Sequence, residues 1–183
     1  MDKLNRYCAE LKKAMETLAQ DERTIFLGQT VGFPGSRFTY KTFKDIPLDK
    51  RVELPIMEEA QMGICTGLAM AGYVPIAVYP RFDFVLLAAN QLINHLDKIR
   101  DLSCGRLNPK VIIRTIVGST IPFSPGAQHC QDHTEQFRTM MHNINVIKLS
   151  NPDMIVPSYL GALSNKTQKS TLLVEEGNLH YGE

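Results

Sequence analysis

The sequence predicts an α/β fold with a doubly wound, mostly parallel sheet covered by helices on both faces. Two observations predict this class: short apolar strands alternate with amphipathic segments along the chain, and the connections suit right-handed crossovers. The length of 183 residues suits one domain that buries a substantial core. We therefore expect a single domain spanning residues 1–183.

The composition excludes several function classes. The chain is 44% hydrophobic and 21% charged, with a formal net charge of +1, which gives no basic footprint for nucleic acid. No apolar run approaches the roughly 20 residues that span a bilayer, and the N-terminus lacks the apolar core of a signal peptide. The four cysteines are scattered without Cys-x-x-Cys spacing. We expect a cytoplasmic protein with reduced thiols that binds neither nucleic acid nor membrane.

The first fifty residues predict a helix, a strand and a loop. Apolar residues recur three and four positions apart over residues 4–18, as on one face of an amphipathic helix. Residues 24–27 form a short apolar strand that ends at Gly28. Residues 29–50 are rich in Gly, Pro, Thr and Lys, and loops of that length in compact domains are usually functional.

Helices and strands alternate regularly after residue 57. Residues 110–116 are the clearest strand because they are β-branched and lie between Pro109 and Gly118. Asn151 and Pro152 are typical of a helix start, as cap and first-turn residue. The predicted helices are 58–72, 84–102, 132–142 and a segment from 151; the predicted strands are 74–79, 110–116, 145–149 and 171–175.

The helix that begins at Glu58 carries a stripe of small residues: Ala60, Gly63, Gly67 and Ala71. Glycine inside a helix costs about 1 kcal/mol relative to alanine, so two glycines on one face indicate a close backbone approach. Internal packing and contact with another subunit explain the stripe equally well.

Glu58 itself has two interpretations. A carboxylate in the first helical turn is favoured by the helix dipole alone. In a partly apolar cleft it would instead act as an acid/base group, with its pKa raised by desolvation. Glu59 points about 100° away and is the natural control.

Aromatic residues and a histidine follow other predicted strands. Phe82 and Phe84 come just after one strand, and His129 lies in a Gly/Pro loop after another, where ligands bind in sheets of this kind. Core packing is the alternative for either Phe.

The set His129, Cys130 and His133 lacks a fourth zinc ligand, so we expect no metal site in this chain. Gly-x-Ser-x-Gly, Walker and Gly-x-Gly-x-x-Gly motifs are absent from the sequence.

Several short motifs occur in a fixed order. They are Pro55-Ile56-Met57-Glu58, Gly67-Leu68-Ala69-Met70-Ala71-Gly72, Phe82-Asp83-Phe84, Gly126-Ala127-Gln128-His129 and Leu173-Val174-Glu175-Glu176. Together they resemble the beta subunits of 2-oxoacid dehydrogenases, over nearly all of this chain. The resemblance implies a transketolase-like pyrimidine-binding domain for thiamine diphosphate.

The resemblance also implies roles for individual residues. Glu58 would hydrogen-bond the aminopyrimidine ring, favour its imino tautomer and so activate the cofactor. Phe84 would stack on the pyrimidine, and His129 would donate to substrate or intermediate. Phe82 and Gln29 would lie beside the cofactor. Gln29 departs from the family, which has an acid after the glycine of this strand.

A partner chain is implied as well. No Gly-Asp-Gly occurs in the sequence, so an alpha-type subunit would hold Mg2+ and the diphosphate, in a heterotetramer with self-association across the Glu58 helix. The chain ends about where the family's C-terminal domain would begin. We therefore expect a 2-oxoacid decarboxylase or dehydrogenase subunit. The alternatives are a two-chain transketolase and a non-catalytic regulatory or scaffold relative.

Overall fold

Six parallel strands form the centre of the protein in the computed structural model, which describes residues 5–34, 39–164 and 169–181. Their order across the sheet is β2-β1-β3-β4-β6-β5. The strands are β1 (Thr24–Gly28), β2 (Arg51–Glu53), β3 (Val74–Tyr79), β4 (Ile112–Val117), β5 (Ile144–Leu149) and β6 (Ser170–Glu176). The parallel α/β prediction is confirmed.

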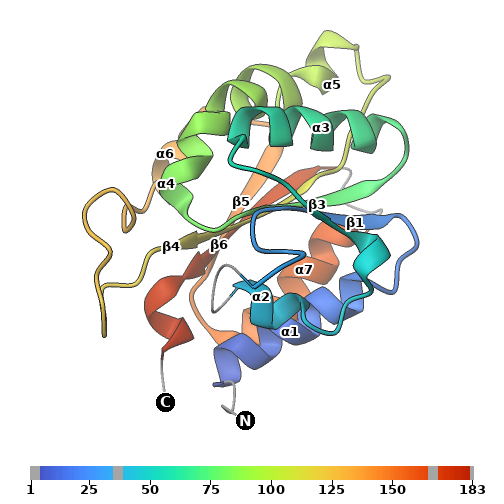
Figure 1. The fold of residues 1–183 in the computed structure, drawn as a ribbon. Helices are drawn as coiled ribbons and strands as arrows, with labels where there is room; N and C mark the ends of the chain where they lie inside the picture. The colour runs from blue at the N-terminus through green and yellow to red at the C-terminus, as the bar shows by residue number, and fades with distance from the viewer. Residues whose placement is uncertain (1–4, 35–38, 165–168, 182–183) are drawn as a thin grey trace.

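Helices cover both faces of this sheet (Figure 1). One layer holds α1, α2 and α7, and the other holds α3, α4 and α6 (Figure 1). Their bounds are α1 (Arg6–Leu18), α2 (Thr39–Phe43), α3 (Glu58–Met70), α4 (Phe82–Val85), α5 (Ile99–Leu102), α6 (Thr134–Met140) and α7 (Ile155–Leu163). No helix of the described ranges is both long enough and apolar enough to cross a membrane.

Asparagine side chains cap two helix starts, and Asn151 is the predicted one of the two. The Asn5 side chain accepts a hydrogen bond from the backbone N–H of Cys8 (2.9 Å) and begins α1. Leu4, at the predicted start of that helix, lies outside the described residues. The Asn151 side chain accepts from the backbone N–H of Asp153 (3.0 Å), and a short 3-10 turn then leads into α7.

Two segments differ from the sequence-based prediction. The expected loop 29–50 contains α2 and is followed by the three-residue edge strand β2, which is too short to show an alternating pattern. The expected helix 84–102 is divided into α4, a 3-10 turn, a π-helix (Asn90–Leu96) and α5. Apolar residues recur three to five positions apart in 3-10, α- and π-helices alike, so the apolar spacing in the sequence does not distinguish a continuous α-helix from this series of short helices.

Each face of the sheet has its own apolar core. Alternate residues of one strand point into different cores: Ile112 of β4 packs with α1 and α7, whereas Ile113 packs with α3, α4 and α6. Every residue of β3 and β4 is buried. Burial on both faces explains why β3 reads as a continuous apolar run; β4 departs from this pattern at Arg114 and Thr115.

Candidate functional site

The predicted site residues all follow the carboxyl ends of strands. Gln29 follows β1, Glu58 is the first residue of α3 after β2, Phe84 lies in α4 after β3, and His129 lies in the loop after β4. Parallel strands place these ends along one edge of the sheet, where ligands of such folds bind.

The Glu58 side chain lies almost out of water, with 5% of the residue exposed. Its Oε1 accepts a hydrogen bond of 3.3 Å from Gln29 Nε2. Its backbone carbonyl accepts from the Tyr79 hydroxyl (3.0 Å), which ties the start of α3 to β3. Burial of Tyr79 raises the pKa of its phenol well above the ordinary value, so this donor stays protonated. Glu58 is thus a buried carboxylate on a fixed backbone with one long contact from a neutral amide.

Two features hold the backbone around Gln29 in place. Gly28 has a φ of +146°, and a Cβ there would lie 2.2 Å from the Val78 carbonyl oxygen, so β1 approaches β3 only with glycine at this position. The Glu53 carboxylate then accepts from three consecutive backbone N–H groups: Thr30 (2.7 Å), Val31 (2.9 Å) and Gly32 (2.7 Å). The loop that carries Gln29 is therefore held from both sides.

A broad, open cavity lies beside Glu58. Its volume is about 520 Å³. Its lining comprises Met57, Glu58, Glu59, Ala60, Gly63, Leu87 and Gln91. Glu59 is exposed and accepts from Asn90 Nδ2 (2.9 Å), in agreement with its expected solvation. Glu58 and Glu59 share this cavity, but of the two only Glu58 is buried.

Phe84 and His129 form a second pair. Both are half-buried, and their rings meet edge to face with centroids 5.5 Å apart. The histidine loop passes so close to the end of β4 that a Cβ at Gly118 would lie 1.7 Å from the His129 carbonyl oxygen. Asp83, which is 8% exposed, binds the same loop by accepting from Gln131 Nε2 (2.8 Å). No contact between this pair and the Glu58–Gln29 pair is recorded in the described part of the chain.

Phe82 occupies a different environment. It is fully buried and packs against Phe137 (centroids 5.4 Å apart) and His133 (5.6 Å). Its ring therefore presents no surface to a ligand, and the core-packing alternative describes it.

The residues considered as zinc ligands have other contacts. The His133 ring packs against Phe82, and Cys130 Sγ contacts the Ser119 carbonyl (3.5 Å). Among residues 5–34, 39–164 and 169–181, no three His, Cys, Asp or Glu side chains are grouped to hold a metal ion.

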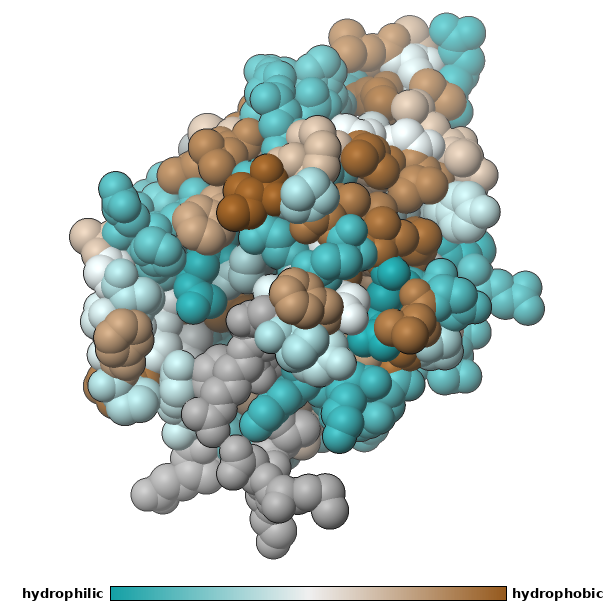
Figure 2. All heavy atoms as spheres, in the orientation of Figure 1, coloured by the Kyte–Doolittle hydropathy of each residue, from teal (hydrophilic) through white to brown (hydrophobic). Residues whose placement is uncertain are grey.

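The small-residue stripe of α3 faces outward. The buried side of the helix is formed by Glu58, Gln61, Met62, Cys65 and Thr66. A Cβ at Gly67 would meet nothing within 4 Å, so internal packing does not require this glycine. Exposed apolar side chains accompany the stripe, and Figure 2 shows hydrophobic surface over the half of the molecule that contains α3. The exposed apolar side chains include Ile64 and Met70 on α3, Ile56 before α3 and Leu87 beside it.

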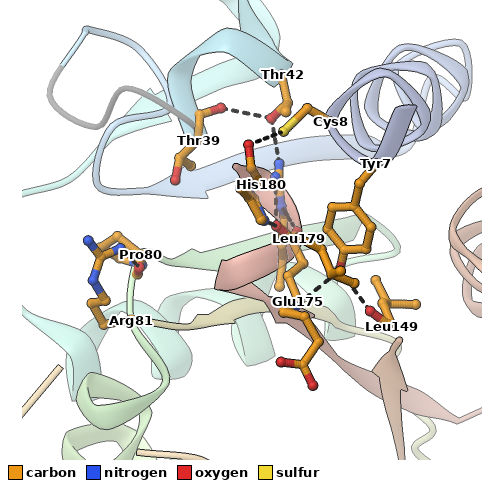
Figure 3. A network of polar contacts seen from close by, with 12 residues as sticks. Tyr7, Cys8, Thr39, Thr42, Pro80, Arg81, Leu149, Glu175, Leu179 and His180 are labelled. Carbon is orange, nitrogen blue, oxygen red and sulfur yellow. Dashed lines mark hydrogen bonds and ion pairs between the residues drawn. The ribbon is translucent and has the colours of Figure 1, made fainter. Parts of the chain in front are cut away.

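A second buried carboxylate, Glu175, lies on the face of the sheet that α1 and α7 cover, and Figure 3 shows its surroundings. Glu175 of β6 and Arg114 of β4 are both completely buried and form an ion pair. The remaining Glu175 contacts come from His180 Nε2 (3.1 Å) and the Tyr159 hydroxyl (3.2 Å). Burial alone would raise the pKa of Glu175, but the Arg114 charge and the His180 hydrogen bond outweigh it and lower the pKa to about 2.

Sequence reasoning missed this network and the Asp83–Gln131 contact. Arg114 was the available signal, because a charged residue inside a buried apolar strand needs a partner.

Comparison with known proteins gives a consistent result. A family model described as the pyrimidine binding domain of transketolase matches residues 7–180. The beta subunit of the pyruvate dehydrogenase E1 component of Cyanidium caldarium is 32% identical over 133 residues, which cover 70% of this chain and 38% of that protein. The beta subunit of 3-methyl-2-oxobutanoate dehydrogenase of Mycobacterium tuberculosis is 30% identical, covering 75% and 39%. This chain thus spans about two fifths of the length of these relatives.

Solved structures share the fold at lower identity. The transketolase of Campylobacter jejuni superposes with a TM-score of 0.67 at 18% identity, over 93% of this chain and 25% of that one. A split-gene transketolase, described as an inactive beta4 tetramer, gives a TM-score of 0.60 at 17% identity, over 93% and 50%.

Proposed function

The chain belongs to the family of transketolase pyrimidine-binding domains, and from this premise we propose that it is the beta-type subunit of a heteromeric thiamine-diphosphate-dependent enzyme. The proposed reaction is decarboxylation of a 2-oxoacid or transfer of its acyl or ketol unit. The observation that carries the proposal is Glu58, a carboxylate only 5% exposed at the open strand-end cavity, with one long amide contact.

The residues around Glu58 fit the pyrimidine half of the cofactor. When bound, thiamine diphosphate would supply the electron sink for cleaving the bond next to a carbonyl. Glu58 Oε2 has no recorded partner in the described part of the chain, so it is the oxygen that would share a proton with a ring nitrogen. Gln29 would orient the carboxylate through Oε1 without neutralising it, because an amide carries no charge.

Phe84 and His129 would form the other part of the site. Their edge-to-face contact leaves each ring partly exposed, so Phe84 has a face for an aromatic ring and His129 has a polar edge for a substrate oxygen. The close passage at Gly118 and the Asp83–Gln131 bond would keep the loop in place. Because Phe82 is fully buried and packs on Phe137, we assign it to the core and not to the ligand site.

A partner subunit is part of the proposal. The sequence has no Gly-Asp-Gly for magnesium and diphosphate, so an alpha-type subunit carrying that motif would complete the site. The outward small-residue stripe of α3 and the apolar residues around it would form the subunit contact, including contact between copies of this chain in a heterotetramer.

Glu58→Gln tests this proposal in the enzyme reconstituted with its alpha-type partner. We expect turnover of pyruvate or a branched 2-oxoacid to fall by a factor of about 100 to 10,000, the usual contribution of a positioned acid/base group. Glu59→Gln is the matched control, because it changes an exposed carboxylate on the same cavity. Unchanged turnover of Glu58→Gln would reject the assignment.

Gln29 favours a second candidate function. A neutral amide stands where the resembled family has an acid, which suits a regulatory or scaffold relative that binds the partner without turnover. Gln29→Glu, assayed beside the wild type with the partner, discriminates the two: an active enzyme turns over before the change, whereas a relative silenced at this position should turn over only after it. A ketol donor supplied in place of a 2-oxoacid tests the two-chain transketolase alternative in the same assay.

A further inference from the structure

Arg81 lies at the same sheet edge with an unusual set of contacts. It is the residue before α4, is half-buried, and donates from Nη1 to the carbonyl of its neighbour Pro80 (2.7 Å). Its Nε is buried and has no hydrogen-bond partner among the residues that the structure describes. In the described part of the chain, no carboxylate is recorded within 4 Å of its guanidinium.

A guanidinium nitrogen that is held away from water is unfavourable unless an acceptor binds it. A guanidinium always carries its charge in a protein, and withdrawing it from water is costly unless an opposite charge or several acceptors replace the water. The buried Arg114 of this protein obeys that rule, with Glu175, Thr42 and the Phe43 ring around it. Arg81 does not, although it lies at the edge where the proposed cofactor and substrate residues gather.

The surroundings of Arg81 form a small cavity between strand ends. Its volume is about 20 Å³, enough for a single water molecule or ligand oxygen. The lining comes from the end of β4 and from the segments after β3, β4 and β6: Arg81, Ile116, Ser119, Gly177, His180 and Tyr181. Figure 3 shows Arg81 beside Pro80, with no dashed line to the network of Tyr7 and Glu175.

We propose that Arg81 is an anion-recognition residue that binds the carboxylate or phosphate group of the substrate. Both groups present an anionic oxygen that a guanidinium binds, and one such oxygen would fill the small cavity and accept from Nε. The identity of the ligand as substrate rests on the function proposed above. The presence of an anion site does not, because it follows from the unpaired charge and the cavity.

The test is a titration of the 15N-labelled full chain, observed at the Arg81 Nε–H resonance. The resonance is assigned by its loss in Arg81→Lys. Inorganic phosphate and pyruvate are added separately, with ionic strength held constant by sodium chloride. We expect a saturable shift for one or both, and calorimetry of Arg81→Gln should show at least a tenfold loss of affinity. The exposed Arg100 provides the control resonance, and its replacement Arg100→Gln should leave binding unchanged.

The outcomes separate the sources of the anion. Saturation by phosphate alone indicates a phosphorylated donor, and saturation by pyruvate alone indicates a carboxylate site. No saturable shift with either, or the same shift at Arg100, would overturn the proposal. The wild-type titration decides this even where Arg81→Gln fails to fold. Glu58→Gln should titrate as the wild type does, so failure of the proposed function is distinguishable from failure of the anion site.

Discussion

Two buried carboxylates lie on opposite faces of the same sheet and differ in how their charge is balanced. Glu175 is completely buried and is surrounded by Arg114, His180 and Tyr159. Glu58 is 5% exposed and meets one amide nitrogen at 3.3 Å. The first has a partner for each oxygen, whereas Oε2 of Glu58 has none recorded over residues 5–34, 39–164 and 169–181, and Glu58 lines a cavity.

This difference teaches that burial alone does not identify a functional acid. A buried carboxylate with a complete set of partners stabilises one arrangement of the chain, because removal of any partner leaves a desolvated charge. A buried carboxylate with an incomplete set is available to a ligand. Replacement of Glu175 should therefore affect folding, and replacement of Glu58 should affect chemistry.

The largest stability effect is expected at Glu175. Glu175→Ala leaves Arg114 buried without its counterion, and we expect the free energy of unfolding to fall by about 3–5 kcal/mol. Urea unfolding followed by circular dichroism measures it. Glu58→Gln, the comparison variant, should change the stability by less than about 1 kcal/mol, since the one side-chain bond recorded for Glu58 in the described part of the chain is long. Equal decreases in the free energy of unfolding for Glu175→Ala and Glu58→Gln would contradict the distinction drawn between these carboxylates.

The acid dependence of stability sharpens the same contrast. The pKa of Glu175 is lowered to about 2 in the folded protein from 4.5. A lowered folded-state pKa stabilises above the unfolded value, so this contribution should be lost as the pH falls from 4.5 toward 2. In the double variant Arg114→Met/Glu175→Leu, urea unfolding at several pH values should show a shallower slope across that window. An unchanged slope would mean that other groups carry the acid dependence.

Glu53 is expected to have an intermediate effect. Glu53→Ala removes a carboxylate that accepts from three backbone N–H groups, and we expect a loss of about 1–2 kcal/mol because the loop around it is exposed. Hydrogen exchange of residues 30–32 should accelerate, and turnover in the reconstituted enzyme should fall because this loop carries Gln29. Glu22→Ala, at an exposed acid, is the control. Unchanged exchange would show that Glu53 does not hold the loop.

The smallest effect has the opposite sign. Gly67→Ala should raise the free energy of unfolding of the isolated chain by about 1 kcal/mol, because Gly67 is helical and a Cβ there meets nothing within 4 Å. The same change should weaken assembly, measured by sedimentation, if the stripe is a subunit contact. If Gly67→Ala stabilises the chain and leaves assembly unaltered, the proposal that Gly67 serves a subunit contact is wrong.

The sequence predicts the layers of the fold better than it predicts the contacts of the site. The central strands are predictable because burial on both faces gives apolar runs, as in β3. The edge strand β2 has three residues and carries no such signal. Glu175 and Arg114 are 61 positions apart, and only the β4–β6 pairing brings them together.

Phe82 and Phe84 show the same limit at close range. They are two residues apart and have identical side chains, yet one packs on Phe137 inside the core and the other meets His129 at the surface. Their difference is set by the direction of a short helix against the strand end. Sequence spacing alone does not define that direction.

The most direct test of the central claim follows the proton that Glu58 would control. In the enzyme reconstituted with its partner, magnesium and thiamine diphosphate, quenched-flow NMR measures how fast the acidic ring proton of the coenzyme exchanges with deuterium. We predict that Glu58→Gln slows this exchange at least a hundredfold while Glu59→Gln leaves it at the wild-type rate. Exchange at the wild-type rate in Glu58→Gln would contradict the account.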